Sequence, residues 1–206
     1  KRQLVKKINL NSLYGAILNP GCRFFDKRIG QSTTLTGRQI VKHMSAEVNK
    51  VITGEYDHVG KSVIYGDTDS VYFSAWPVLK DDIESGKLEW SPEKAIALYD
   101  QVAEQANTTF GDFMAQAFHC PKSRSDVIAA GREIVARSGL YITKKRYAAL
   151  VTDNEGFRTD VDGKPGKVKA MGLDLRRSDT PVFMQKFLSE LLLMVLTETP
   201  QKDVLD

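Results

Sequence analysis

Residues 63 to 73, VIYGDTDSVYF, constrain the fold more than any other part of this sequence. Two short runs of β-branched and aromatic residues flank Gly, Asp, Thr and Asp, which is the pattern of two strands joined by a tight turn. We therefore expect a β-hairpin with strands near 61–66 and 70–75 and with Asp67 and Asp69 at its tip. Such residues suit a turn that has no further role. Two carboxylates on a rigid hairpin are, however, also the oxygen ligands that Mg²⁺ prefers.

Four other segments have the apolar spacing of amphipathic helices. Ser91 and Pro92 suit the first positions of one helix, and Gly54 suits the end of another. The first segment has no capping residue before it, so we expect a helix already under way at residue 1. The predicted helices cover residues 1–15, 32–54, 91–118 and 181–198.

The remaining segments are predicted to be strands and loops. Residues 132–160 have the pattern of strands, with DNEG as a turn, and DGKPGK at 162–167 is a basic loop. We expect irregular structure at 20–30 and a loop at 120–127. Strands in the middle of the chain with helices on one side predict an α+β fold.

The charge is distributed unevenly along the chain. The net charge is only +3, but residues 1–31 carry +6, residues 32–121 carry −6 and residues 122–177 carry +6 again. An acidic middle between two basic segments suits a metal site that is flanked on both sides by surfaces that bind a polyanion. Solvated charged faces explain the same pattern equally well.

Other function classes are disfavoured by composition. Cys22 and Cys120 have no CxxC spacing or histidine cluster around them, so neither a disulfide framework nor a zinc site is indicated. The longest apolar run, in FLSELLLMVL, is too short to span a bilayer. We expect no membrane partner and a reduced, cytoplasmic setting.

Lys7, Asn11 and Tyr14 fall on one face of the first predicted helix. A cation, an amide and a phenol on one stripe could contact a phosphate, a base or sugar edge, and a ring. Taken alone, the same triplet is typical of a solvent-exposed face.

Four motifs in order resemble those of family B DNA polymerases. KINLNSLYG matches the fingers-helix pattern KxxxNSxYG, and YGDTDS matches the palm motif that holds a catalytic aspartate. KKRY at 144–147 resembles the KxY primer-gripping motif, and KAMGLDLRRSDTP at 169–181 resembles the segment that leads to the thumb. The resemblance covers most of the chain and is greatest to the polymerases of T-even-like bacteriophages.

The resemblance implies a division into three parts: the end of a fingers helix at 1–18, an incomplete palm domain at 19–180 and the start of a thumb at 181–206. The aspartate hairpin would belong to a palm-type antiparallel sheet covered by helices on one side. Asp69 would be the shared ligand of two Mg²⁺ ions, and Asp67 would lie behind the direct ligands or bind a metal only transiently. Lys7 would contact the triphosphate of a dNTP, and Asn11 and Tyr14 would line the pocket of the nascent base pair.

The resemblance also implies contacts with primer-template DNA. Lys145 and Tyr147, two residues apart on one predicted strand, share one side of it and would face the primer, while Lys144 and Arg146 would face template or solvent. Phosphate or minor-groove contacts are expected from a further group of cations, for which surface salt bridges are the alternative: Lys169, Arg176 and Arg177. Glu133 is a candidate third acid on a strand beside the hairpin.

The chain departs from the family in one important respect. The family's other catalytic aspartate belongs to a DxxSLYPS segment, which does not occur in these 206 residues, and neither does an exonuclease domain. We therefore expect a chain that is inactive alone and that needs the remainder of a polymerase as its partner, either as a fragment or as one piece of a split enzyme. An absent strand would also leave a neighbouring strand edge unpaired.

Two alternatives from other classes remain. A non-catalytic module could keep the polymerase's grip on DNA and perform no chemistry. A metal-dependent nuclease could use the same acids, although no additional acid or histidine cluster supports it.

Overall fold

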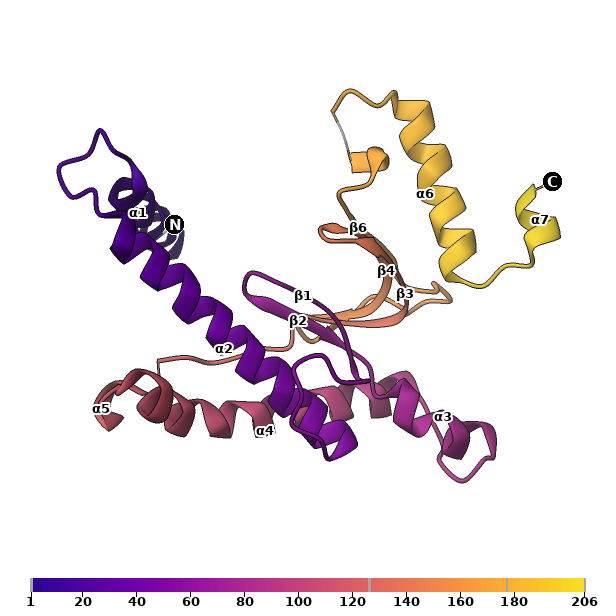
Figure 1. The fold of residues 1–206 in the computed structure, drawn as a ribbon. Coiled ribbons are helices and arrows are strands. Elements are labelled where there is room, and N and C mark those ends of the chain that lie inside the picture. Colours follow the sequence, from indigo (N-terminus) through magenta and orange to yellow (C-terminus); the bar gives the residue numbers. More distant parts are fainter. Residues whose placement is uncertain (1, 126, 177, 206) are drawn as a thin grey trace.

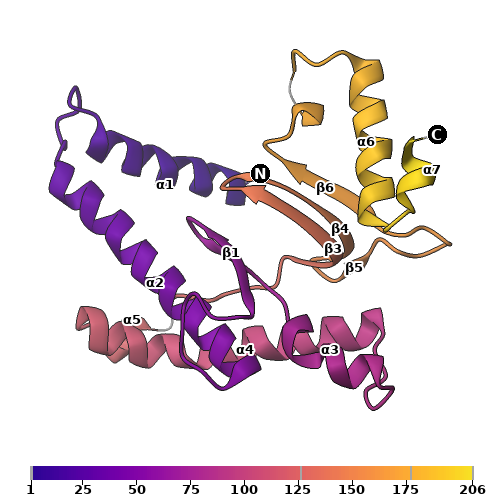
Figure 2. The same cartoon turned by 45° about the vertical axis from the view of Figure 1, so that its right-hand side comes forward.

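The computed structural model describes residues 2–125, 127–176 and 178–205, and it has an α+β fold. Figure 1 shows two long helices, α2 (Lys27–Thr53) and α4 (Pro92–Phe118), which cross beneath a small hairpin, while α6 (Val182–Leu196) stands beside a separate sheet. Figure 2 shows the same arrangement from another side. The predicted α+β fold class is confirmed, because the chain combines helices with antiparallel strands.

The helical predictions are confirmed in place, with corrections at their ends. Helix α1 (Arg2–Leu18) runs through Gly15, and α2 begins at Lys27, so the predicted irregular segment at 20–30 is wrong from residue 27 onward. The cause is Asp26, whose carboxylate accepts a hydrogen bond from the Arg28 backbone N–H at 2.9 Å and caps the helix. Helices that the periodicity did not predict are short: α3 (Trp76–Glu84), α5 (Lys122–Ser125), the 3₁₀ turn η1 (Asp174–Arg176) and α7 (Gln201–Leu205).

The strands form two hydrogen-bonded units. Strands β1 (Val63–Asp67) and β2 (Ser70–Phe73) make the predicted hairpin. In the second unit, β4 (Arg146–Asn154) pairs antiparallel with the three other strands: β3 (Ile134–Thr143), β5 (Phe157–Arg158) and β6 (Lys167–Met171). The predicted DNEG turn is confirmed, because Glu155 and Gly156 take positive φ angles of 50° and 88° between β4 and β5. Strand β6 was not predicted.

The core is divided in the same way. Beneath the hairpin, Val48 of α2 packs with Val102 and Ala106 of α4. At the larger sheet, Ala148 and Leu150 of β4 pack with Leu196 of α6. The two clusters share no residue, so each sheet has its own apolar support.

Asparagines and arginines join the helices to the strands. The buried amide of Asn49 on α2 accepts a hydrogen bond from Ser62 Oγ at 2.7 Å and donates to the Glu55 carbonyl at 2.8 Å, which fixes the chain just before β1. Asn107 on α4 pairs with the Ala130 backbone before β3 through bonds of 2.8 and 2.7 Å.

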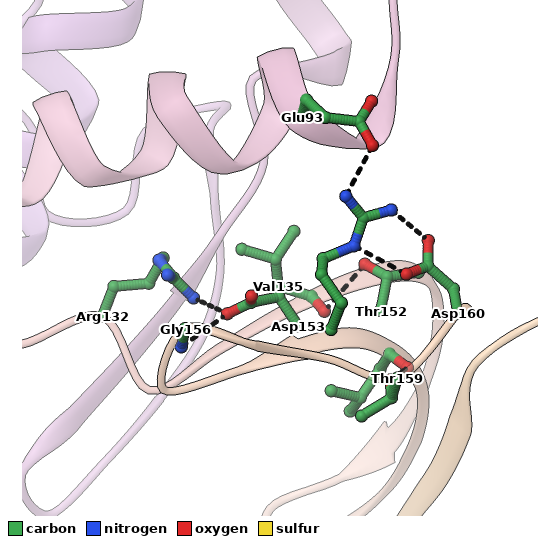
Figure 3. A network of polar contacts seen from close by, with 10 residues as sticks. Glu93, Arg132, Val135, Thr152, Asp153, Gly156, Thr159 and Asp160 are labelled. Atoms are coloured by element: carbon green, nitrogen blue, oxygen red, sulfur yellow. Dashed lines mark hydrogen bonds and ion pairs between the residues drawn. The ribbon is translucent and has the colours of Figure 1, made fainter.

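The guanidinium of Arg158 on β5 donates hydrogen bonds to Glu93 at the start of α4 and to Asp160. Figure 3 labels both carboxylates, with the bonds that they accept drawn as dashed lines. This guanidinium lowers the pKa of Glu93 to about 2. Arg132 bonds both Asp153 on β4 and Asp100 on α4. Ion pairs thus connect α4 to the larger sheet along one side.

Candidate functional site

The tip of the β1–β2 hairpin is a two-residue turn. Asp67 pairs with Ser70 in the antiparallel register, so Thr68 and Asp69 form the connection. Thr68 takes a positive φ of 51°, and the Asp69 N–H donates to the Asp67 carbonyl at 2.6 Å. The Ser70 hydroxyl donates to that same carbonyl at 3.1 Å. Local hydrogen bonds therefore fix where the two aspartates stand.

The two carboxylates point to different surroundings. Asp67 Oδ1 accepts a hydrogen bond from the Thr68 hydroxyl at 3.1 Å, and its Oδ2 lies 3.9 Å from Lys145 Nζ. Asp69 is exposed, lines a cavity of about 600 Å³ and makes no ion pair with any residue that the structure describes. Asp69 thus presents a free carboxylate to this cavity, whereas Asp67 is partly neutralised by a lysine.

The cavity lies between two strand edges. It touches the consecutive residues 68–74, which include β2, and the consecutive residues 128–139, which include most of β3. Successive side chains of a strand point to opposite faces, so a cavity that meets every residue in turn is bounded by the strand's edge. Within the described residues, β2 pairs with β1 and β3 pairs with β4, and neither pairs on its other side. We call this cavity the strand slot.

Apolar side chains of the two long helices form the other wall of the strand slot, among them Met44 and Phe110. Arg132 and Glu133 also line it. Glu133 lies one residue before β3, and its Oε1 accepts a hydrogen bond from Lys169 Nζ at 2.7 Å. The candidate third acid therefore shares the slot with Asp69 but is already paired. Lys169 thus forms a salt bridge with Glu133, which was the alternative to a DNA contact that the sequence left open for this residue.

The KKRY segment forms a second tight turn. Thr143 pairs with Arg146, so Lys144 and Lys145 connect β3 to β4 in what we call the lysine turn. Lys145 has a positive φ of 63°. The prediction that Lys145 and Tyr147 share a strand face is therefore wrong, because Lys145 is a turn residue. Its side chain is 64% exposed and remains open to a ligand. The Arg146 side chain donates to the Gly172 carbonyl at 3.2 Å.

Tyr147 lies at the junction of the two hairpins and is only 2% exposed. Its hydroxyl is 2.7 Å from that of Tyr72. Tyr65 and Tyr141 complete a cluster whose ring centroids lie 5.2 to 6.1 Å apart. Burial, together with the hydrogen bond to Tyr147, raises the pKa of Tyr72, and burial raises the pKa of Tyr141 to about 12.

Sequence reasoning missed this tyrosine cluster, although a signal was present. Tyr65 and Tyr72 flank the aspartate turn and are cross-strand partners, and Tyr141 and Tyr147 flank the lysine turn in the same way. Aromatic pairs facing each other across tight turns commonly stabilise hairpins. That two such pairs pack together could not be seen without the tertiary structure.

The other predicted site residues lie away from the strand slot. Lys7 and Asn11 are exposed on α1, Tyr14 on the same helix is partly exposed, and none of the three lines the slot. Arg177 lies outside the described residues, and Arg176 is described in its backbone alone, at the end of η1.

Among the described residues, no group of three or more His, Cys, Asp or Glu side chains is placed to hold a metal ion. No helix in that part of the chain is long and apolar enough to cross a membrane.

Comparisons with known proteins agree with the motifs. Residues 1–82 match the family model of DNA polymerase family B. The chain is 29% identical over 205 residues to the DNA-directed DNA polymerase of Escherichia phage RB69, which covers 95% of this chain and 22% of that protein. It is 28% identical to the DNA-directed DNA polymerase of Enterobacteria phage T4 over 218 residues, with the same two coverages, 95% and 22%. DNA polymerase II of Escherichia coli (strain K12) is 26% identical over 198 residues, or 96% of this chain and 22% of that protein.

The resemblance inferred from the motifs is thus confirmed over nearly the whole chain. The chain spans about a fifth of the length of these curated relatives.

Proposed function

Because the chain resembles family B DNA polymerases over most of its length, we propose that it is the part of a DNA-directed DNA polymerase that carries the aspartate hairpin and the primer-gripping turn. The observation that carries the proposal is the position of Asp69. Its side chain is a free carboxylate at the tip of the aspartate hairpin, and the lysine turn lies beside the same hairpin. The polymerase would act in the cytoplasm, on primer-template DNA and dNTPs.

Asp69 fits a magnesium site that further ligands complete. Mg²⁺ usually binds through one or two carboxylates, substrate phosphates and water rather than through a cage made only of protein atoms. A single exposed carboxylate facing a cavity meets that need, and no three-residue cluster among the described residues competes with it. When bound, two Mg²⁺ ions would lower the pKa of a primer 3′-hydroxyl and neutralise the leaving pyrophosphate.

The residues of this chain would bind and orient the substrates. Asp69 would hold the metals, with Asp67 as a lesser ligand. Lys7 would contact the dNTP triphosphate, while Asn11 and Tyr14 would line the base-pair pocket. The DNA backbone would be bound by Lys144 and Lys145 of the lysine turn and by three further cations, Lys169, Arg176 and Arg177. Contact of Tyr147 with the primer stays a prediction. Sequence-independent contacts of this kind suit an enzyme that must accept every base pair.

The resemblance implies a second metal-binding aspartate in a DxxSLYPS segment, and the strand slot supports an extended segment as its source. Within the described residues, neither β2 nor β3 pairs with another strand on the side of the slot, so a single inserted strand could pair with both. Such a strand would join β2 and β3 into one sheet and would end near Asp69. Without it, the chain is expected to be inactive.

Complementation tests the proposal. The chain is mixed with a polypeptide that contains a DxxSLYPS segment, and extension of a labelled primer is followed with and without Mg²⁺. We expect extension only when both polypeptides and Mg²⁺ are present, and we expect Asp69→Ala to abolish it. Asp81→Ala, which removes an exposed carboxylate on α3, is the matched control. Extension that is unaffected by Asp69→Ala would contradict the proposed mechanism.

The second candidate function, a non-catalytic DNA-binding module, is favoured by the exposure of the Lys145 side chain, which is 64% exposed and could bind a phosphate without any metal. It predicts that the chain binds primer-template equally well in EDTA and in Mg²⁺. It also predicts no extension with any complementing polypeptide.

A further inference from the structure

The junction between the two hairpins contains a contact that the proposed function does not use. Tyr65 lies on β1 two residues before Asp67, so both side chains project from the same face of that strand. This is the face turned toward the lysine turn: the Tyr65 hydroxyl accepts a hydrogen bond from the Lys145 backbone N–H at 2.7 Å. Asp67 meets the ammonium of the same lysine at 3.9 Å. One strand face therefore contacts Lys145 at both its backbone and its side chain.

The backbone of Lys145 needs such support. A positive φ of 63° is unfavourable for a residue with a side chain, and it persists where the surrounding structure enforces it. Gly172 packs against the other side of the turn, so closely that a Cβ there would lie 2.1 Å from the Lys145 carbonyl oxygen. Lys145 is thus held between Gly172 and the Tyr65 hydroxyl.

The remaining tyrosines strengthen this contact. Tyr72, the cross-strand partner of Tyr65, has its hydroxyl 2.7 Å from that of Tyr147, which lies two residues after Lys145. The rings of Tyr65 and Tyr147 lie 6.1 Å apart. The two hairpins therefore meet through hydrogen bonds at two points, and the lysine turn cannot shift without breaking one of them.

We infer that Tyr65 is a positioning residue for Lys145: its hydroxyl fixes the lysine turn so that the ammonium is held beside the aspartate hairpin, where it can bind a DNA phosphate. This inference rests on the proposed function, in which Lys145 contacts primer-template DNA. The aspartate hairpin and the DNA-binding turn then act as one unit, and a hydroxyl that touches neither metal nor DNA sets the distance between them.

A double-mutant cycle on the 206-residue chain tests the inference without any need for catalysis. Binding to a fluorescently labelled primer-template duplex is measured by anisotropy in EDTA over a series of NaCl concentrations. The variants are Tyr65→Phe, Lys145→Ala and the double variant. Tyr56→Phe is the matched control, because it removes a tyrosine hydroxyl that hydrogen-bonds His43 and is remote from the lysine turn. Circular dichroism verifies that each variant is folded.

Lys145→Ala should weaken binding and reduce the slope of log K against log [NaCl] by about 0.9, the loss of one phosphate contact. Tyr65→Phe should weaken binding by roughly three- to tenfold, the usual worth of one hydrogen bond. In the Lys145→Ala background, Tyr65→Phe should have a clearly smaller effect, because it acts mainly through that lysine side chain. Tyr56→Phe should leave binding unchanged.

Three outcomes would overturn the inference, and they differ in what they leave standing. Equal weakening by Tyr65→Phe in both backgrounds would mean a general structural effect. Weakening by Lys145→Ala but not by Tyr65→Phe would remove the positioning role and leave the proposed function intact. If Lys145→Ala itself has no effect, the proposed DNA contact fails and the inference fails with it.

Discussion

Lys145 Nζ lies 3.9 Å from Asp67 Oδ2, while Asp69, two residues further along the same hairpin, faces the strand slot with no charged partner among the described residues. The two aspartates of the GDTD turn therefore have different electrostatic surroundings. A carboxylate that already pairs with a lysine is the weaker candidate for a metal ligand, because the metal would have to displace the ammonium. The two residues should differ in the same way when they are mutated.

In the complementation assay, we expect Asp67→Asn to lower Mg²⁺-dependent primer extension by about tenfold or less and Asp69→Asn to lower it by at least about a hundredfold. Both substitutions keep the shape of the side chain and remove the charge. Extension rates over a Mg²⁺ titration measure the difference. Equal losses for the two variants would show that Asp67 contributes to the metal site as much as Asp69 does.

Asn49→Ala should destabilise the chain by roughly 2 to 4 kcal/mol. Asn49 is fully buried, and its amide satisfies the buried Ser62 and the carbonyl of Glu55 just before β1. Urea unfolding followed by circular dichroism gives the free energy of the step in which the cluster around Val102, beside Asn49 on α2, loses its packing. Gln101→Ala, at an exposed position of α4, should change it by less than about 0.5 kcal/mol. A similar small change for Asn49→Ala would mean that water replaces the asparagine without cost.

Gly172→Ala should disturb the lysine turn. Its φ of 65° disfavours any side chain, and the new Cβ would also collide with the Lys145 carbonyl, so we expect a loss of more than about 2 kcal/mol together with weaker DNA binding. Gly86→Ala is a matched control: its φ is 73°, but nothing lies within 4 Å of the new Cβ. It should cost only about 1 to 2 kcal/mol and leave DNA binding intact. If the two variants behave alike, the close approach of Gly172 to the turn has no importance for binding.

The ion pair between Glu93 and Arg158 should make stability depend on pH in the acid range. Arg158 lowers the pKa of Glu93 from 4.5 to about 2, so the contribution of this carboxylate is fully present above pH 4.5 and is lost as the pH falls toward 2. Glu93→Gln should therefore lower the urea midpoint at pH 7, and the difference from the unmodified chain should shrink progressively below pH 4.5. Because the pair is exposed to solvent, the difference at neutral pH should be small.

Glu104→Gln, also on α4, is the control for this experiment, because no ion pair of Glu104 occurs among the described residues. It should give no such pH-dependent difference. A Glu93→Gln effect that stays constant from pH 7 to pH 3 would rule out the ion pair as its cause.

The parts of the fold that could be predicted are those with a strong local signal. Apolar spacing predicts the long helices, and Ser91 predicts the start of α4. The Ser91 hydroxyl accepts a hydrogen bond from the Lys94 N–H at 3.3 Å, as expected of a capping residue. The aspartate hairpin is predictable because Gly, Asp and Thr between β-branched runs favour a tight turn. The exact start of α2 was missed because the Asp26 cap precedes a stretch with little apolar periodicity.

The parts that could not be predicted depend on tertiary contacts. The turn between β3 and β4 consists of two lysines, Lys144 and Lys145, whereas glycine and asparagine usually occupy a two-residue turn. The positive φ of Lys145 is enforced by Tyr65 and Gly172 from elsewhere in the chain. A local pattern therefore indicated a continuous strand. Strand β6 was missed for a similar reason, since its five residues, KVKAM, gain their pairing from β4 and have weak strand propensity of their own.

The division of the apolar core into two clusters also has a consequence for cooperativity. The cluster around Val102 and the cluster around Leu150 have no residue in common, so each can lose its packing without opening the other. Equilibrium unfolding should then proceed in two steps, and the side-chain signals of the tyrosines at the junction of the hairpins should change with the first of them. A segment that fills the strand slot would link the two clusters through one continuous sheet. Its binding would merge the two steps into a single transition.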